Sequence, residues 1–251
     1  MPNPIAYTNY IFACHITGVY DVNRNETLAA DDISLCLPWI RSVEKAGLKA
    51  VLFHNNFSAA TVNAYSCANL QFQQINYDVT FKPNVYRYKA YCDYLQQHVI
   101  NIQNLFITDV ADVVLLNNPF TQPLFIDNVN CLFCGDEPVN LNNEWMQQHS
   151  AFLRPQIAGY AHFEQTFANN PLLNCGIVGG SIKVMQLFLQ QLWHLHQTYN
   201  KNNTTVYTGD MGAFNYLVRT KYNHQLKHGA PINTVFKAYD TFNTTYWFRH
   251  K

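Results

Sequence analysis

The first half of the chain alternates between strand-like and helix-like segments, and this alternation constrains the fold more than any other feature of the sequence. Four segments have the length and residue preferences of strands, at residues 7–15, 48–54, 70–77 and 104–108. Helical patterns lie between them, at residues 31–47, 58–66 and 84–99. This order predicts an α/β fold with a mixed, mostly parallel sheet flanked by helices.

The second half is less regular and is predicted to extend the same domain. Strand patterns cover residues 129–138 and 171–180, and the second is expected to break into a turn at Gly179–Gly180. Helical patterns cover residues 144–150, 155–167, 181–199 and 208–220. The 251 residues are 48% hydrophobic and contain no repeat or low-complexity linker, so we predict a single domain over residues 1–251.

Composition narrows the functional classes. Sixteen basic and sixteen acidic residues leave no net charge, so bulk electrostatics does not indicate a nucleic-acid partner. The N-terminal residues lack the pattern of a signal peptide and no apolar run reaches the ~18 residues of a membrane span, so we expect a cytoplasmic protein. Seven cysteines at wide spacings do not indicate a disulfide framework, and the C-x-x-C of Cys131 and Cys134 is interpreted as two thiols of a buried strand, with half a zinc site or a redox pair as the alternatives.

Two carboxylates interrupt an apolar segment at residues 104–120. Asp109 follows a fully apolar strand pattern, and Asp112 comes three residues later, before the apolar run resumes. A buried unpaired carboxylate costs several kcal/mol, so both side chains need compensation. A divalent cation such as Mg²⁺ or Mn²⁺ would supply it, because such ions favour oxygen ligands and substrate phosphates. The alternative is that Asp112 caps a turn and Asp109 pairs with a lysine.

Several segments, in order along the chain, resemble the motifs of GT-A glycosyltransferases. The segment "FITDVADVVLLNNPF" resembles their metal-binding motif, in which an apolar strand ends in Asp-x-Asp; this chain has D-x-x-D, with Ala111 where the second acid normally lies. Five other segments are similar to the family's remaining motifs: "YIFACHITGVYD", "NVYRYKAY", "LLNCGIVGGS", "TGDMGAFNYLV" and "YWFRHK". The resemblance implies a Rossmann-like GT-A domain, with residues 1–117 as the nucleotide-binding half and residues 118–251 as the acceptor-binding half.

The resemblance also implies roles for individual residues. Asp109, Asp112 and His250 are placed on the metal, and His228 competes with His250 for the third position. The residues implied to contact the donor are Thr17, Tyr20, Arg87, Asp109, Val110, Ala111, Asn174, Gly176, Gly179, Gly180 and Lys251. The candidates for proton transfer are Asp210, which also suits a helix cap, and Asp136 and Glu137.

The predicted function is metal-dependent transfer of a sugar from a nucleotide donor, with a UDP-sugar expected, to a hydroxyl of a glycan or another acceptor. A Mn²⁺ or Mg²⁺ ion is the expected cofactor. Two rivals use the same residues: a metal-dependent phosphohydrolase or nucleotidyltransferase, and a non-catalytic carbohydrate-binding module on the same fold.

Overall fold

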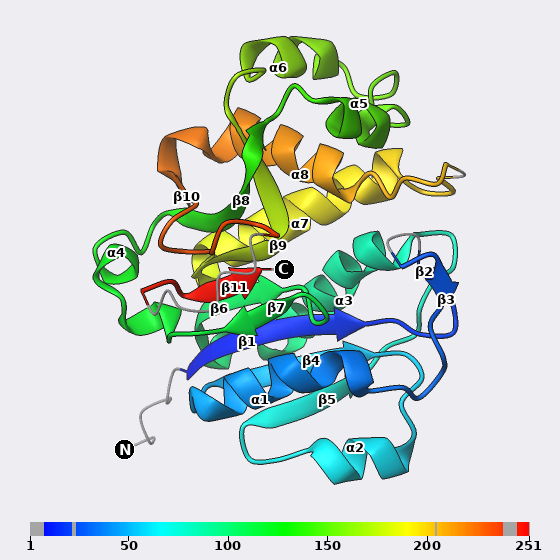
Figure 1. The fold of residues 1–251 in the computed structure, drawn as a ribbon, viewed down its shortest axis with the longest axis vertical. Helices are drawn as coiled ribbons and strands as arrows, with labels where there is room; N and C mark the ends of the chain where they lie inside the picture. Colours follow the sequence, from blue (N-terminus) through cyan, green and yellow to red (C-terminus); the bar gives the residue numbers. More distant parts are fainter. Residues whose placement is uncertain (1–7, 22–23, 204, 238–244, 251) are drawn as a thin grey trace.

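A seven-stranded sheet forms the centre of the molecule (Figure 1). The computed structural model describes residues 8–21, 24–203, 205–237 and 245–250. The strands lie in the order β10-β8-β9-β6-β1-β4-β5. Their bounds are β1 Thr8–His15, β4 Lys49–His54, β5 Leu70–Gln74, β6 Ile102–Thr108, β8 Leu132–Asn140, β9 Pro171–Ser181 and β10 Leu226–His228. Two short antiparallel pairs lie beside it, β2 Tyr20–Asp21 with β3 Glu26–Thr27 and β7 Val113–Leu115 with β11 Phe248–His250.

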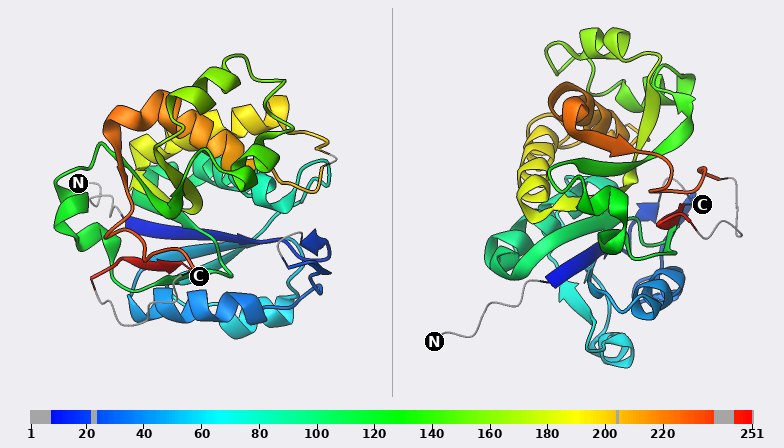
Figure 2. Two further views of the ribbon diagram at one scale, coloured as in Figure 1. Left: turned by 45° about the horizontal axis from the view of Figure 1, so that its top comes forward. Right: turned by 90° about the vertical axis from the view of Figure 1, so that its left-hand side faces the viewer.

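Helices cover both faces of this sheet. The α-helices are α1 Leu37–Lys45, α2 Ala59–Tyr65, α3 Pro83–His98, α4 Pro123–Ile126, α5 Glu144–Ser150, α6 Tyr160–Thr166, α7 Ile182–Tyr199 and α8 Asp210–Leu217. Single turns of 3-10 helix occupy Ser34–Cys36, Val99–Asn101, Pro119–Thr121 and Asn223–Gln225, and a π-helix occupies Val218–Tyr222. Helices α3 and α7 pack against each other on one face, and α1 lies on the other (Figure 2, right). The predicted α/β fold with a mostly parallel sheet is confirmed.

The direction of the strands determines where functional groups gather. β1 is parallel to β4 and β6, β4 to β5, and β8 to β10, whereas β9 is antiparallel to both β6 and β8. The carboxyl ends of β1, β6, β8 and β10 therefore share one edge of the sheet with the amino end of β9. From β1 the chain continues to β4 and β5 on one side and then returns to β6 on the other. Such a reversal of strand order leaves a crevice between the two strands.

Alternate side chains of β1 face the two cores. Phe12 packs with Tyr88 and Tyr91 of α3 in one core, whereas Ile11 lies in the other with Trp39 of α1. All five side chains are at most 1% exposed. Burying an aromatic or branched side chain contributes about 1.5–3 kcal/mol, so both faces of the sheet are stabilised by the same strand. The helix predicted over residues 84–99 is α3, and its Tyr88, Tyr91 and Leu95 side chains are buried.

The β7–β11 pair brings the end of the chain to the sheet. Val113 pairs with His250 and Leu115 with Phe248 in an antiparallel register. The apolar run that follows the two aspartates forms β7. His250 pairs with Val113 of β7, which follows Asp109 by only four residues, so the pairing brings His250 close to Asp109. The segment "YWFRHK" thus contributes a short strand over Phe248–His250, paired with β7.

Two predicted helices begin later than expected. α1 begins at Leu37 and not near residue 31, where the helical pattern begins, because a 3-10 turn at Ser34–Cys36 precedes it. α6 begins at Tyr160, because Gly159 has a left-handed backbone with φ of 82° that interrupts the helical pattern.

The predicted turn at Gly179–Gly180 is wrong. β9 continues through both glycines to Ser181, and Gly179 pairs with Phe106 of β6 and Phe133 of β8. A Cβ atom on Gly179 would lie 2.2 Å from the Phe106 ring. The glycine is therefore required by a large side chain that crosses the strand.

Strands from both predicted halves of the chain join in one sheet, because β6 pairs with β9. All seven cysteines are free thiols. Cys134 lies buried in β8, whereas Cys131 lies just before this strand and is partly exposed, so the interpretation of two thiols in a buried strand holds for Cys134 alone. No helix in the described ranges combines the length and apolar character that crossing a bilayer requires.

Candidate functional site

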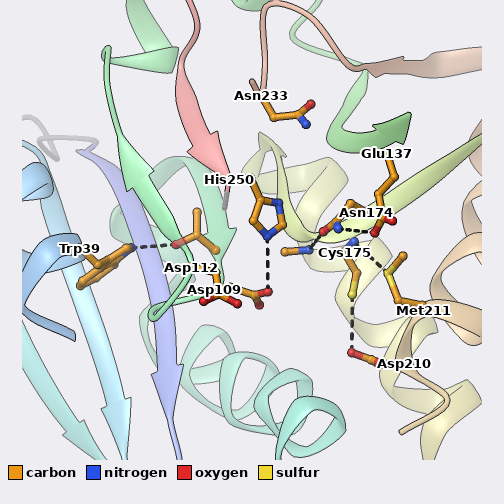
Figure 3. Close-up of polar contacts among 12 residues, drawn as sticks. Trp39, Asp109, Asp112, Glu137, Asn174, Cys175, Asp210, Met211, Asn233 and His250 are labelled. Carbon is orange, nitrogen blue, oxygen red and sulfur yellow. Dashed lines mark hydrogen bonds and ion pairs between the residues drawn. The ribbon is translucent and has the colours of Figure 1, made fainter. Parts of the chain in front are cut away.

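Asp109 lies immediately beyond β6, at the carboxyl end of the strand that pairs with β1. Its backbone N–H donates to the carbonyl oxygen of Gly176 at 2.8 Å, which fixes the turn against the amino end of β9. Its carboxylate forms an ion pair with the guanidinium of Arg87 from α3. On the other side, the indole of Trp39 donates to the Thr108 hydroxyl at 2.8 Å and holds the end of β6 against α1 (Figure 3). The turn at Asp109 is thus held by β9 and by two helices, α3 and α1, and Arg87 of α3 contacts the carboxylate itself.

His250 lies next to Asp109, as Figure 3 shows. The ring atom Nε2 is 4.0 Å from Oδ2 of Asp109, and the side chain is 2% exposed. Burial lowers the pKa of His250 to about 4, with Asp109 opposing the shift and Arg87 adding to it. The imidazole is therefore neutral at pH 7. Its Nδ1 atom is buried without a hydrogen-bond partner among the described residues, which is unusual for a native polar atom.

Gly176 lets Asp109 and His250 approach the backbone of β9. A Cβ atom at this position would lie 2.6 Å from Oδ2 of Asp109 and 2.6 Å from Cε1 of His250. Its N–H donates to the side-chain oxygen of Asn174 at 2.7 Å, and the Asn174 amide donates to Glu137 at 2.8 Å. The amino end of β9 thereby links Asp109 to the acidic end of β8.

Arg87 is a buried cation shared between two acids. Besides its ion pair with Asp109, its Nη2 lies 3.8 Å from Oδ2 of Asp210 at the start of α8. The same nitrogen is 3.2 Å from the Tyr88 hydroxyl and 3.3 Å from the Cys175 sulfur. Since Arg87 is 8% exposed and Asp210 is 5% exposed, the charges are compensated largely within the protein.

Asp210 and Glu137 have opposite electrostatic environments. Burial opposes ionisation of Asp210, but Arg87 and the Thr208 hydroxyl hold its pKa below the ordinary range. Burial raises the pKa of Glu137, with the Asn174 hydrogen bond acting against the shift. A general base works best with a pKa close to the working pH, so Glu137 is the better proton acceptor and Asp210 the better anchor for Arg87.

Asp136 precedes Glu137 in β8 and has a different partner. Its Oδ2 lies 2.9 Å from Nδ1 of His228 at the end of β10. His228 thus pairs with Asp136, and the structure places His250, and not its rival, beside Asp109. Asn233 binds both backbone groups of Asp136. The Asp136 N–H donates to the side-chain oxygen of Asn233 at 3.2 Å, and the side-chain amide of Asn233 donates to the Asp136 carbonyl oxygen at 3.0 Å.

The two acids of the D-x-x-D segment are not in the same environment. The Asp112 side chain is 48% exposed and lies 3.3 Å from Nη2 of Arg24. Within the described ranges, no three or more His, Cys, Asp or Glu side chains gather closely enough to hold a metal ion by themselves. The predicted three-residue shell of Asp109, Asp112 and His250 is therefore not assembled in this structure.

Asp109 and His250 alone fit a divalent cation. Two ligand atoms at ~2.1 Å from one Mg²⁺ ion are separated by at most ~4.2 Å, and Oδ2 and Nε2 are 4.0 Å apart. Mg²⁺ commonly uses one or two protein ligands and takes the remainder from waters and substrate phosphates. The donor pair would be the Asp109 carboxylate and the neutral Nε2 of His250; the unpartnered atom of that ring is Nδ1, on its other side.

The other residues implied for donor binding are spread more widely. Thr17 follows β1 at the same edge, and its hydroxyl is buried without a partner among the described residues. Val110 is buried in the turn after Asp109, Ala111 packs against the core that contains α1, and Tyr20 is 53% exposed in β2. Gly179 and Gly180 lie inside the sheet, away from Asp109, and Lys251 lies outside the described residues.

Sequence reasoning missed several side chains that shape this edge. Asn55 follows β4 and accepts from the Thr17 N–H at 2.9 Å, and the Asn56 amide donates to the Thr17 carbonyl at 2.8 Å. The strand-end rule that selected Asp109 applies equally to these asparagines and could have found them. No sequence pattern pointed to Cys175, because its contact with Arg87 depends on how α3 packs against the sheet.

No family model matches this chain, and a search of curated proteins finds no match.

Proposed function

We propose that this chain is a glycosyltransferase that moves a sugar from a nucleoside diphosphate donor, with a UDP-sugar as the first candidate, to a hydroxyl of a glycan or another acceptor. The observation that supports it most is the convergence of Asp109, His250, Arg87 and Gly176 beyond the carboxyl ends of β1 and β6. Open α/β sheets bind ligands at such a reversal of strand order. The segments that resemble GT-A motifs contribute these same residues.

A Mn²⁺ or Mg²⁺ ion held by Asp109 and His250 would neutralise charge on the diphosphate. Arg87 acts through Asp109: it orients the carboxylate and balances Asp210. Gly176 leaves room for the Asp109 and His250 side chains against the backbone of β9. These features would keep the carboxylate and the imidazole in place before the donor binds, which lowers the cost of ordering them.

Glu137 and Asn174 lie on the acceptor side of this proposal. Asn174 can both donate and accept hydrogen bonds, as sugar hydroxyls require. In a direct displacement, the acceptor oxygen bonds to the anomeric carbon while the bond from that carbon to the diphosphate oxygen breaks with its electron pair. The proton of the acceptor hydroxyl passes to Glu137, whose raised pKa favours proton uptake.

A thermal-shift panel tests the proposal. Nucleoside diphosphate sugars are added to the protein with and without Mn²⁺; a donor at 100 times its Kd stabilises the folded state by about 2.7 kcal/mol, which raises the melting temperature. We expect UDP-sugars to stabilise the protein only with Mn²⁺, and UDP release to increase with a hydroxyl acceptor.

Two other results would replace the proposal. Release of inorganic phosphate from simple esters, without an acceptor, would indicate a phosphohydrolase. Stabilisation by free sugars but by no nucleotide would indicate a carbohydrate-binding module.

A further inference from the structure

A second cavity opens beside the candidate site, at the outer end of β8. Its volume is about 370 Å³, which is within the ~300–1,000 Å³ of small-molecule sites. Residues 136–140, Ala230, residues 233–236 and Tyr246 supply most of its wall. No residue on the Asp109 side of the site lines it, so it is a separate space.

Two contacts connect this cavity to the candidate site. Glu137, which lines the cavity, accepts from the amide of Asn174, and Asn174 accepts from the Gly176 N–H. Phe236, which also lines it, packs edge-on against His250 with 4.7 Å between ring centroids. Figure 3 shows Glu137 and Asn174 together, with His250 between them and Trp39. A molecule in this cavity would therefore lie next to the group around Asp109.

The wall of the cavity combines acceptors with apolar side chains. Asp136 and Glu137 are carboxylates, and the hydrogen bonds of the described residues engage Oδ2 of the first and Oε1 of the second, which leaves an oxygen of each for a ligand. Val139 and Phe236 provide apolar surface in the same cavity. Such a wall suits a molecule that has hydroxyl groups along its edge and C–H groups on its face.

The charge of the wall selects against anions. The described lining residues include two carboxylates and no lysine, arginine or histidine. Two basic groups lie beside this lining: Lys237, whose Nζ is 5.1 Å from the centroid of the Phe236 ring, and His228, which pairs with Asp136. Because both charged side chains of the described lining are carboxylates, a carboxylate or phosphate group on the ligand would be repelled by them.

We infer that this cavity binds the acceptor, and that the acceptor presents an uncharged sugar ring. The inference rests on the proposed function, because it takes the neighbouring group around Asp109 as the donor site. The sugar hydroxyls donate to Asp136 and Glu137, and the apolar face of the ring packs against Val139 and Phe236. This position brings a hydroxyl to Glu137, whose pKa is raised by burial, and Glu137 is joined through Asn174 to the donor side.

The test measures binding of neutral methyl glycosides by saturation-transfer NMR and calorimetry, on the full chain, with and without UDP and Mn²⁺. The probes are the methyl pyranosides of glucose, galactose and mannose, and methyl glucuronide is the anionic counterpart. We expect at least one neutral glycoside to bind, and methyl glucuronide to bind at least about tenfold more weakly.

Val139→Trp fills the cavity from a position that is 46% exposed, so it leaves the core intact. Leu187→Trp is the matched control, because Leu187 is 51% exposed on α7 and does not line the cavity. Val139→Trp should abolish glycoside binding and Leu187→Trp should leave it unchanged. Glu137→Gln should weaken binding about tenfold, as expected for the loss of a charged hydrogen-bond acceptor.

The failure of this inference can be distinguished from the failure of the proposed function. If UDP binds with Mn²⁺ but no neutral glycoside binds, or if Val139→Trp binds glycosides as the unaltered protein does, the cavity is not the acceptor site and the donor site stands. If glycosides bind in the cavity but no nucleotide binds, the sugar site stands and the transferase proposal fails. Equal binding of methyl glucuronide would overturn the preference for an uncharged ring.

Discussion

Asp109 and Asp112 lie three residues apart in one acidic segment, yet they belong to different environments. Asp109 is held by Arg87, by the backbone of Gly176 and by a buried histidine at 4.0 Å. Asp112 is about half exposed and pairs with Arg24, whose side chain is itself 30% exposed. The first contributes to a partly buried charge network, where each interaction is strong, and the second to a surface ion pair, which typically contributes about 0–1 kcal/mol.

The position of an acid relative to the strand end therefore matters more than its membership of a motif. Asp109, which directly follows β6, remains at the edge of the sheet, close to β9 and β11. Three residues later the chain has turned towards solvent. The comparison yields predictions about the two arginines, the buried network and the glycine that faces Asp109.

The largest expected effect is that of Arg87→Met. Removing the cation leaves Asp210, with a side chain 7% exposed, without its compensating charge, and such changes cost about 3–5 kcal/mol of the free energy of unfolding. Urea denaturation measures the loss. Arg24→Met, which removes the partner of Asp112, should cost less than about 1 kcal/mol. Equal losses in the two variants would show that the two acids are not electrostatically different.

The double variant Arg87→Met with Asp210→Asn tests whether the uncompensated charge of Asp210 causes the loss of stability in Arg87→Met. Since it removes the charge that the single variant exposes, it should recover part of the lost stability. A double variant that is less stable than Arg87→Met would contradict the charge argument.

The buried network also predicts a pH dependence. Burial lowers the pKa of His196 to about 4, with Asp210 opposing the shift and Arg87 adding to it. The unfolded chain takes up this proton near pH 6.5, whereas the folded chain takes it up only near pH 4. Because the unfolded state then binds more protons between these values, stability falls as the pH is lowered from 6.5 to 4, by up to about 3 kcal/mol.

His196→Gln tests this dependence, with exposed His162→Gln as the control. Urea denaturation at several pH values should show a flatter curve for His196→Gln and an unchanged curve for His162→Gln. If His196→Gln leaves the slope of the wild-type curve intact, the neutral buried imidazole is not its source.

Gly176→Ala should have a smaller effect on stability, of about 1–3 kcal/mol, because the added Cβ forces Asp109 and His250 to move. Gly179→Ala is the comparison in the same strand, since its Cβ would meet the Phe106 ring and not the site. When the measured binding is corrected for the fraction of folded protein, only Gly176→Ala should weaken the binding of UDP with Mn²⁺. Equal weakening in both variants would mean that general loosening of β9, and not the space beside Asp109, controls binding.

Local patterns were sufficient to predict much of the fold. The strands β1, β4 and β6 and the helices α3 and α7 follow their periodicity, because each places a continuous apolar face on a core. Gly179–Gly180 misled the prediction: glycine is a turn signal in isolation, but here it accommodates Phe106, which belongs to another strand. A contact between segments of distant sequence position leaves no local signature.

The candidate site was predictable to the same extent. The strand-end rule selected Asp109, and the resemblance to GT-A motifs selected Arg87, Asn174, Gly176 and His250, which the fold places together. The sequence did not show that Asp109 and Asp112 lie in different environments, because the burial of a turn depends on which other strands pack beside it. Nor could it show that Arg87 pairs with Asp109, since that contact is set by the packing of α3 on the sheet.

Calorimetry with UDP, with and without Mn²⁺, on Asp109→Asn and Asp112→Asn tests the central claim most directly. Loss of a metal ligand typically weakens binding by about 10–100-fold or more, so Asp109→Asn should lose the Mn²⁺-dependent binding, whereas Asp112→Asn should stay within about threefold of the wild type. Wild-type affinity for UDP and Mn²⁺ in Asp109→Asn, or an equal loss in both variants, would contradict the account.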